Sequence, residues 1–247
     1  MSAASNPIVI IPARMASTRL PRKPLADIAG VPMIVHVWRR AMEAAIGPVA
    51  VAAAEPEIAA AVTQAGGRAV LTRPEHATGS DRVHEALQLL DPERRHDAVV
   101  NLQGDVPTLD PRHIRAVLAP LADAAVDIAT LAAVIQRPES RDDPSVNKVV
   151  AGLAPGIMVA RALYFSRARV PSGEGPLFHH IGIYAYRRTA LERFVALPRG
   201  VLERRENLEQ LRALEAGMRI EVTLVDTVPL DVNTPADLAL ARQMLAV

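Results

Sequence analysis

Three basic side chains follow the first apolar run of the chain at close spacing. They are Arg14, Arg19 and Lys23, in the stretch IPARMASTRLPRKPL that covers residues 11–25 and overlaps the apolar run PIVI. A phosphate-binding loop needs backbone N–H groups that can point at the ligand and cations that offset its charge. Small residues between the arginines allow the backbone to approach a ligand. The stretch is therefore either a solvated basic loop or a cradle for an anion.

Two further polar clusters follow later apolar runs. Gln103, Gly104 and Asp105 lie in NLQGDVP, and a carboxylate at a strand end is suited to Mg²⁺, which needs only one or two carboxylates beside phosphate oxygens and water. The segment HATGSDR (residues 76–82) carries His, Thr, Ser and Arg where a strand is expected to pass into a helix. It is either a helix cap with Arg82 on the surface or a loop that faces a base or a phosphate.

The second half of the chain adds two candidate clusters. In HHIGIY, His180 and Tyr184 share one face if the segment is a strand, whereas the adjacent His179 and His180 point to opposite faces, which argues against a two-histidine metal site. In LDVNTPADL, an Asn-Thr-Pro turn before a helix is an ordinary capping arrangement. Asp231 in this segment offers a second carboxylate to a metal.

Composition excludes several classes of function. Half of the 247 residues are hydrophobic and 22% are charged, which is typical of a soluble globular protein. Lys and Arg (28) nearly balance Asp and Glu (27), which argues against a nucleic-acid partner. The absence of cysteine excludes disulfides, thiolate catalysis and thiolate metal ligands. No transmembrane run or signal peptide is recognisable, so we expect a cytoplasmic protein without membrane insertion.

Short apolar runs alternate with amphipathic stretches over the first half of the chain, which is the pattern of βαβ units and a largely parallel sheet. Strands are predicted at 7–13, 48–54, 69–72 and 97–105, and helices at 33–45, 56–65, 83–90 and 111–121. The helix at 83–90 is expected to have its cap at Ser80-Asp81. Ligands bind beyond the carboxyl ends of parallel strands, and the basic loop, HATGSDR and NLQGDVP all fall there. The GxxxxGK[ST] and GxGxxG loops are absent, which excludes a P-loop NTPase and disfavours a dinucleotide-dependent oxidoreductase.

The alternation of predicted strands and helices ends after residue 127. Four strand-like runs follow without a long helix between them, at 127–135, 147–152, 157–166 and 179–186, which predicts antiparallel pairing. Helices are predicted at 189–197 and 203–217, a strand at 220–226 and a last helix from Pro235. We predict a single α/β domain over residues 1–247 with a β-rich subregion at about 127–187. The glycine-rich loop at 171–176 is the best candidate for a mobile segment.

Six motifs, taken together, resemble the 3-deoxy-manno-octulosonate cytidylyltransferase (CMP-Kdo synthetase) family from about Ile8 to Met244. They are IPARxASTRLPxKPL, HATGSDR, VNLQGDxP, ALYFSRAxVP, HHIGIYAYR and LEQLRALE. Each is weak alone, but their order and spacing are specific. The resemblance implies a nucleotidyltransferase-type, Rossmann-like mixed sheet that is mainly parallel and flanked by helices, with a β-rich excursion at about 140–187 that makes the contact of a homodimer.

The resemblance also implies the reaction. CMP passes from CTP to the anomeric hydroxyl of the acid sugar Kdo in a Mg²⁺-dependent transfer that releases pyrophosphate, and CMP-Kdo serves lipopolysaccharide synthesis. Phosphoryl-type transfer depends on positioning and charge stabilisation more than on covalent chemistry by the protein. The absence of a nucleophilic triad or a cysteine is therefore no obstacle.

Site residues are implied by position in these motifs. The implied catalytic residues are Arg14, Lys23 and Asp105. The implied nucleotide-binding residues are Arg14, Ser17, Lys23, Arg82 and Gln103. The implied sugar-binding residues are Gln103, Arg167, His180, Tyr184, Glu209 and Gln210. The implied metal ligand is Asp105, with Asn233 and Asp231 as candidates for the second position.

The sequence departs from the family pattern near its C-terminus. The family usually reads Gly-Val-Asp-Thr-Pro, and that Asp is the second metal ligand, but here Asn233 takes its place and Asp231 lies two residues earlier. Residues i and i+2 of a strand share a face roughly 6.5–7 Å apart, so Asp231 substitutes only through a backbone adjustment or a bridging water. We hypothesise that Asp231 takes over part of the metal role. Asn147, where an apolar residue is usual, has no functional account.

Two alternatives remain open at the level of the sequence. The first is a cytidylyltransferase for a related acid sugar, such as an 8-amino analogue of Kdo. The second is a relative that binds nucleotide or sugar with weak turnover, because Asn233 contributes no charge to a metal.

Overall fold

The computed structural model describes residues 5–246, and the chain divides into two compact units. The discontinuous unit contains residues 5–115 and 229–246, and the continuous unit contains residues 116–228. The predicted β-rich subregion lies inside the continuous unit. That the whole chain is a single domain stays a prediction.

Four parallel strands form the main sheet of the discontinuous unit, in the order β5-β4-β1-β6. They are β1 (Pro7–Ala13), β4 (Val49–Ala53), β5 (Arg68–Leu71) and β6 (Ala98–Asn101). All residues of β4 and β6 are buried, as are most of β1. Strands covered on both faces read as continuous apolar runs, which is why the sequence predicted β1, β4 and β6, whereas β5, which was also predicted, is a more exposed edge strand.

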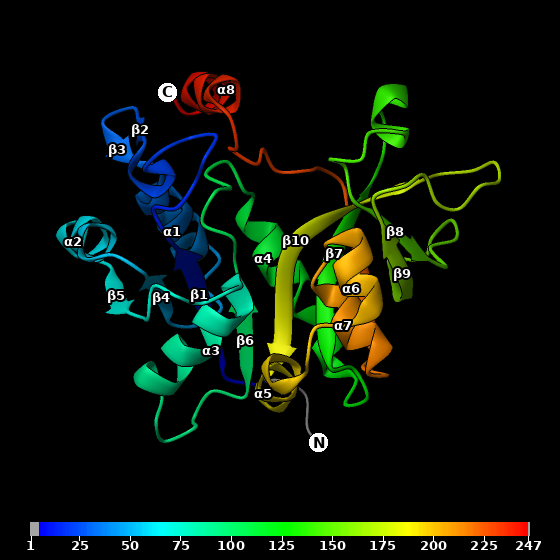
Figure 1. Ribbon diagram of the computed structural model, residues 1–247, viewed down its shortest axis with the longest axis horizontal. Helices are drawn as coiled ribbons and strands as arrows, with labels where there is room; N and C mark the ends of the chain where they lie inside the picture. Colours follow the sequence, from blue (N-terminus) through cyan, green and yellow to red (C-terminus); the bar gives the residue numbers. More distant parts are fainter. Residues whose placement is uncertain (1–4, 247) are drawn as a thin grey trace. The chain divides into compact units, whose positions relative to one another are not determined.

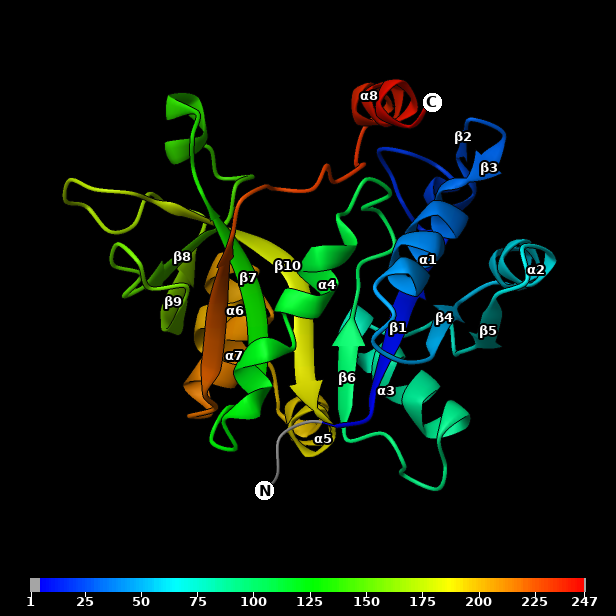
Figure 2. The same cartoon turned by 180° about the vertical axis from the view of Figure 1, so that it is seen from behind.

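Helices cover both faces of this sheet. They are α1 (Met33–Glu43), α2 (Pro56–Gln64) and α3 (Gly79–Leu90). Two further helices are α4 (Pro111–Ala116) and α8 (Pro235–Leu245), and α8 packs on the strand β2. Figure 1 shows α3 in front of the strands, and Figure 2 shows α1 in front of them from behind. The segment between β1 and α1 holds the 3₁₀ turn η1 (Lys23–Leu25) and the short hairpin of β2 (Asp27–Ile28) and β3 (Val31–Pro32).

Two predicted helices of this region differ from the structure. The cap of α3 is Thr78 and not Ser80-Asp81, because the Thr78 hydroxyl accepts from Asp81 N (3.2 Å) while the Asp81 carboxylate accepts from Thr78 N (3.1 Å). The helix predicted at 111–121 ends at Ala116 and is followed by the 3₁₀ turn η2 (Ala119–Ala122). Pro120, which lacks an N–H, cannot continue the α-helix.

The continuous unit has a sheet of five strands in the order β10-β7-β11-β9-β8, and β10 also pairs with β8. They are β7 (Ile128–Val134), β8 (Lys148–Ala151), β9 (Val159–Ser166), β10 (Phe178–Arg187) and β11 (Ile220–Val225). Only β7 and β11 pair in parallel, and the other pairs are antiparallel. The antiparallel stretch is confirmed. The sole helical piece described between β7 and β10 is the 3₁₀ turn η3 (Pro138–Arg141).

Three helices follow β10: α5 (Arg188–Ala196), α6 (Val201–Glu206) and α7 (Gln210–Glu215). The single helix predicted at 203–217 is wrong, because Asn207 adopts the left-handed conformation (φ 53°) and separates α6 from α7. Figure 1 shows α6 and α7 in front of β7, and Figure 2 shows them behind β7 and β11. No helix within residues 5–246 is both long and apolar enough to cross a lipid bilayer.

Candidate functional site

A cavity of about 520 Å³ opens in the discontinuous unit, beyond the carboxyl ends of β1 and β6. This volume lies in the range of small-molecule sites. The lining residues are Pro12, Ala13, Arg14, Ala16, Ser17, Thr18, Arg19, Lys23, Pro24, His76, Thr78, Gly79, Arg82, Gln103, Gly104, Asp105 and Asn233. The structure therefore brings together every predicted nucleotide-binding residue, together with Asp105 and Asn233.

The basic loop forms one wall of the cavity. Glu55 anchors its backbone by accepting from Met15 N (3.0 Å), and the Ser17 hydroxyl accepts from Leu20 N (3.4 Å). The charged side chains on the cavity wall are four cations, Arg14, Arg19, Lys23 and Arg82, against the single carboxylate of Asp105. This excess of positive charge favours a polyanion such as a triphosphate.

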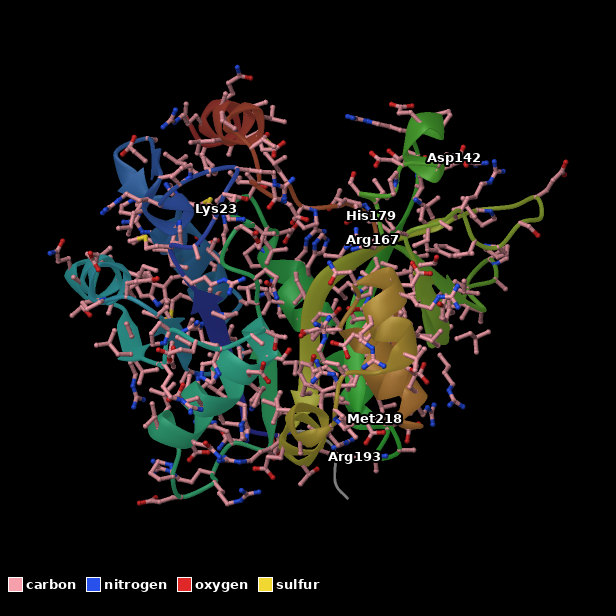
Figure 3. The ribbon with its side chains drawn as sticks, viewed as in Figure 1. Lys23, Asp142, Arg167, His179, Arg193 and Met218 are labelled. Atoms are coloured by element: carbon pink, nitrogen blue, oxygen red, sulfur yellow. The ribbon has the colours of Figure 1, made fainter. Side chains whose placement is uncertain are left out.

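Lys23 lies between the two predicted metal ligands. Its Nζ donates to Asp105 Oδ2 (2.6 Å) and to Asn233 Oδ1 (3.1 Å). Lys23 and Asp105 keep 17% and 24% of their side-chain surface exposed, so the pair opens to solvent through the cavity. Figure 3 shows Lys23 in the blue segment that follows β1. Two oxygens that are suited to a divalent cation are thus held around an ammonium group.

The chain returns to this cavity near its end. Val232 N donates to Asp105 O (2.9 Å), which places Asn233 beside Asp105. The Asp237 carboxylate accepts from Asn233 N (3.0 Å) and Thr234 N (2.8 Å) at the capping box of α8. A small apolar core, here called the end-joining cluster, holds this segment against the basic loop. Its buried members are Leu20, Ile28, Met33, Val232, Leu238 and Ala241.

Asp231 lies close enough to Asp105 for the two charges to interact. The pKa of Asp231 is raised to about 7, first by desolvation among the surrounding atoms and then by the negative charge of Asp105. The side chain of Asp231 is itself exposed to solvent. The segment from 229 to 234 is not a strand, so the spacing assumed from strand geometry does not apply.

The oxygen donors fit a magnesium ion that is completed by a ligand. Within residues 5–246 no group of three His, Asp or Glu side chains converges as a self-sufficient metal site. Mg²⁺, however, is usually bound by one or two carboxylates, with phosphate oxygens and water as its other ligands. Asp105, the amide oxygen of Asn233 and the neighbouring Asp231 are a donor set of this kind. Lys23 already shows that Asp105 and Asn233 can share a cation.

The loop after β6, which forms another wall of the cavity, passes close to the backbone of β1. A Cβ on Gly104 would lie 3.0 Å from Pro12 O and 3.2 Å from Ile34 Cδ1. Only glycine lets the loop after β6 pass so near β1. Gln103 Nε2 lies 3.5 Å from Asn101 Oδ1, and Asn101 Nδ2 lies 3.4 Å from Ser80 Oγ. These weak contacts connect the end of β6 to the start of α3.

Arg82 is more buried than the sequence indicated. Its side chain is 2% exposed, and Nη1 donates to Thr72 Oγ1 (2.6 Å) and Arg73 O (3.0 Å), while Nη2 donates to Pro74 O (3.3 Å). The alternative of a surface arginine behind a helix cap is therefore wrong. Desolvation lowers the pKa of Arg82, but a guanidinium keeps its proton at neutral pH.

The predicted sugar-binding residues other than Gln103 lie in the continuous unit. His180 Nε2 contacts Thr130 Oγ1 (2.9 Å), and the Thr130 hydroxyl donates to Ile183 O (2.8 Å), so His180 carries its hydrogen on Nε2. Burial lowers the pKa of His180 to about 3, so the ring is neutral. Its centroid lies 5.5 Å from that of Tyr184, which confirms that the two side chains share a face.

Several polar groups in the continuous unit are buried near this face. Burial raises the pKa of Tyr184, and the charges of Tyr186 and Glu209 raise it further, so the phenol is neutral. Among the described residues, no protein group hydrogen-bonds Gln210 Nε2 or Asn147 Oδ1, although both atoms are buried. Buried polar atoms normally have partners, so a polar ligand is a natural complement to them.

Arg167 is held by backbone carbonyls. It follows β9 (Figure 3), and its guanidinium donates to Glu206 O (2.7 Å), Pro144 O (3.1 Å) and Asn207 O (3.4 Å). Three of its five N–H groups are used in this way, which leaves two for a ligand. Its predicted contact with a sugar carboxylate stays a prediction.

Sequence reasoning missed two residues that shape the cavity wall. Thr78 caps α3, and the Thr-x-x-Asp spacing of a capping box could have revealed it. Glu85 of α3 pairs with the ring of His76, and no local signal connects these residues because a loop and a helix start separate them.

Comparisons with known proteins agree with the geometry of the cavity. A family model described as "Cytidylyltransferase" matches residues 8–220. The 3-deoxy-manno-octulosonate cytidylyltransferases of Methylorubrum populi and Paramagnetospirillum magneticum are 65% and 64% identical to this chain. They cover 98% and 97% of this chain, and each match spans 98% of the relative.

A solved CMP:2-keto-3-deoxy-manno-octonic acid synthetase complexed with CTP is 39% identical, with a TM-score of 0.89 over 98% of this chain and 99% of the other. A second solved structure, the 4-diphosphocytidyl-2C-methyl-D-erythritol synthase of Anaerococcus prevotii, shares the fold alone. It is 11% identical, with a TM-score of 0.66 over 98% of this chain and 99% of that one. The full-length identity to several such enzymes shows that this chain belongs to the 3-deoxy-manno-octulosonate cytidylyltransferase family.

Proposed function

We propose that this protein transfers CMP from CTP to the anomeric hydroxyl of 3-deoxy-D-manno-octulosonate and releases pyrophosphate. The observation that carries the proposal is the cavity of the discontinuous unit, where the residues of the basic loop and Asp105 meet in a chain of this family. The product is an activated sugar of the kind used in lipopolysaccharide synthesis. We also propose that the reaction takes place in the cytoplasm.

In this proposal the cations on the cavity wall bind the triphosphate and stabilise the charge that develops during the reaction. Arg14 and Lys23 bind the triphosphate, and Ser17 lies between them on the same loop. The sugar hydroxyl gives its proton to solvent while its oxygen forms a bond to the α-phosphorus, in line with the bond between that phosphorus and the bridging oxygen. This second bond breaks, and the departing pyrophosphate takes its electron pair. Arg14 and Lys23 stabilise the charge that develops on it.

Magnesium belongs to the same proposal. Asp105 and Asn233 are the residues that would hold it, with Asp231 close by. When bound, Mg²⁺ supplies charge neutralisation on the phosphates and lowers the pKa of a hydroxyl near it. Lys23, which bridges Asp105 and Asn233 in this structure, would then be free to bind the triphosphate.

The acid sugar is recognised in this proposal by side chains of the continuous unit. Neutral His180 and Tyr184 offer hydrogen bonds from one strand face, and Gln210 offers a buried donor. Arg167 and Glu209 complete the group, Arg167 as a cation for the sugar carboxylate. Support comes from the buried polar atoms without partners, which suit a polyhydroxylated ligand.

Pyrophosphate release tests the proposed reaction. Purified protein is assayed with CTP, UTP, ATP or GTP, each with and without Kdo and Mg²⁺. We expect release only with CTP, Kdo and Mg²⁺ together. Absence of release under those conditions contradicts the proposal, and release with an 8-amino analogue of Kdo but not with Kdo favours the related acid sugar.

We also propose that the protein is a homodimer that uses the β-rich part of the continuous unit. Four large apolar side chains are exposed in or beside β9, namely Ile157 (46%), Met158 (54%), Val159 (39%) and Leu163 (65%). Exposed apolar patches of this kind often mark contacts between chains. A second copy of the chain is the proposed occupant.

Light scattering after size exclusion tests this interface. We expect the wild-type protein to elute with twice the mass of one chain and Leu163→Glu to elute as a monomer. Leu89→Glu, which changes another exposed leucine (54%) that lies on α3, is the matched control and should leave the mass unchanged. A monomeric wild type, or a dimeric Leu163→Glu, contradicts the assignment.

A further inference from the structure

The wall of the cavity between β5 and α3 contains a histidine that the proposed reaction does not use. His76 lines the cavity with a side chain that is only 10% exposed. Its Nε2 is in short contact with Oε2 of Glu85, which lies two turns into α3. Glu85 itself does not line the cavity.

The segment that carries His76 is fixed from α3. Glu85 Oε2 also accepts from Arg73 N (3.0 Å), while Arg82, one turn earlier on the same helix, donates to Arg73 O and Pro74 O. Backbone and side chain are therefore held at several points. The ring of His76 presents a fixed edge to the cavity.

The contact with Glu85 determines where the ring carries its hydrogen. Partial burial acts to raise the pKa of Glu85, but the hydrogen bonds from His76 and Arg73 outweigh it and lower that pKa, so the carboxylate is ionised. An ionised carboxylate only accepts hydrogen bonds, and Nε2 of His76 must donate. In the neutral ring Nδ1 is then an acceptor. Within residues 5–246 no protein group hydrogen-bonds Nδ1.

The distribution of charge in the cavity indicates where the phosphates and the nucleoside of a nucleotide would bind. Arg14 and Arg19, on the basic loop, are in no ion pair with another described side chain and are available to phosphates. The guanidinium of Arg82 instead binds the carbonyls of its own wall. The wall with His76 is thus left for the nucleoside. Cytosine carries an amino donor at C4, where uracil carries an oxygen acceptor.

We propose that Nδ1 of His76 accepts a hydrogen bond from the 4-amino group of the bound cytosine, and that Glu85 is the positioning residue that fixes this tautomer. The pair is then a determinant of base specificity. The inference rests on the proposed function only for the identity of the nucleotide.

Calorimetric binding of CTP and UTP at pH 8.5, above the usual titration range of histidine, tests the inference. His76→Gln keeps an amide donor for Glu85 but removes the acceptor at the Nδ1 position. We expect its Kd for CTP to rise roughly three- to tenfold, the worth of one hydrogen bond, with the Kd for UTP unchanged.

Glu85→Gln provides a second, independent test. Its amide can donate to Nε2, which permits the tautomer with hydrogen on Nδ1, so we expect weaker binding of CTP and tighter binding of UTP. Glu75→Gln changes an exposed glutamate of the same loop and should leave the CTP-to-UTP ratio at the wild-type value. A merely structural pair would weaken both nucleotides equally and would not shift this ratio.

The outcomes separate this inference from the proposed function. Wild-type binding of CTP with an unchanged CTP-to-UTP ratio in both variants overturns the role of His76 and leaves the proposed reaction intact. Equal weakening of both nucleotides also overturns it. Failure of the wild-type protein to bind CTP contradicts the inference and the proposed function together. Thermal unfolding of each variant shows that a changed ratio belongs to folded protein.

Discussion

At the scale of single residues, the ammonium of Lys23 connects two segments of the cavity that lie far apart in the sequence. It joins Asp105 from the loop after β6 to Asn233 from the end of the chain. Lys23→Met keeps the aliphatic stem and removes the charge. We expect kcat/KM for CTP to fall roughly 10- to 100-fold, because a hydrogen bond to a charged group contributes about 1.5–3 kcal/mol.

Steady-state kinetics of pyrophosphate release measure this effect. Arg22→Met is the control, because Arg22 is adjacent in sequence but lies outside the cavity wall. Equal losses in the two variants would mean that the general positive charge of the loop matters and the position of Lys23 does not.

Asp231 is a candidate for the second metal ligand. If it contributes to holding Mg²⁺, Asp231→Ala should raise the Mg²⁺ concentration for half-maximal rate by roughly fivefold, which corresponds to about 1 kcal/mol. Asp142→Ala, an exposed carboxylate of the continuous unit, should leave it unchanged. A Mg²⁺ titration of Asp231→Ala that matches the wild type shows that Asp105 and Asn233 suffice.

At the scale of elements, α6 and α7 are held together by a buried ion pair. Glu203 (2% exposed) accepts from Arg212 Nε (2.9 Å) and Nη2 (2.8 Å) in a two-point contact. Glu203→Gln leaves the guanidinium without its charge partner. We expect the free energy of unfolding to fall by roughly 3–5 kcal/mol, as for other broken buried pairs.

The same contact makes stability depend on pH. Burial acts to raise the pKa of Glu203, but its hydrogen bonds to Arg212 and Gly200 N lower it. A carboxyl with a lowered pKa stabilises the fold fully above its unfolded pKa, and that stability is lost as the pH falls below it. Urea unfolding at pH 7 and pH 3 should show the Glu203→Gln deficit shrinking in acid. Glu174→Gln, on the exposed 171–176 loop, should show no deficit at either pH.

Elements differ in how well the sequence predicts them, for physical reasons. Strands β1, β4 and β6 were predicted because burial on both faces requires an unbroken apolar run. The break between α6 and α7 was not, because one left-handed residue, Asn207, interrupts a helical pattern without changing its apolar spacing. The cavity was predicted because strand ends and basic residues coincide. The pairing of His76 with Glu85 was not, because it depends on how the loop after β5 folds back on α3.

At the scale of the whole molecule, the two ends of the chain share one small core. Leu238 of α8 is buried in the end-joining cluster, whereas Leu240 of the same helix is 45% exposed. Leu238→Ala should lower the free energy of unfolding by about 2–3 kcal/mol and also raise the KM for CTP, because Leu20 and Val232 of the cluster adjoin Lys23 and Asn233. Leu240→Ala should change neither quantity. Denaturant unfolding and CTP kinetics check both.

The order in which the ribosome makes the chain gives the end-joining cluster a further consequence. Residues 5–115 emerge first, but their partners from 229 onward are synthesised only after the whole continuous unit. At roughly 5–20 residues per second, several seconds pass in which Leu20, Ile28 and Met33 have no covering helix. A nascent chain therefore exposes an apolar surface that a chaperone can bind, and its cavity gains Asn233 only after the continuous unit has been synthesised.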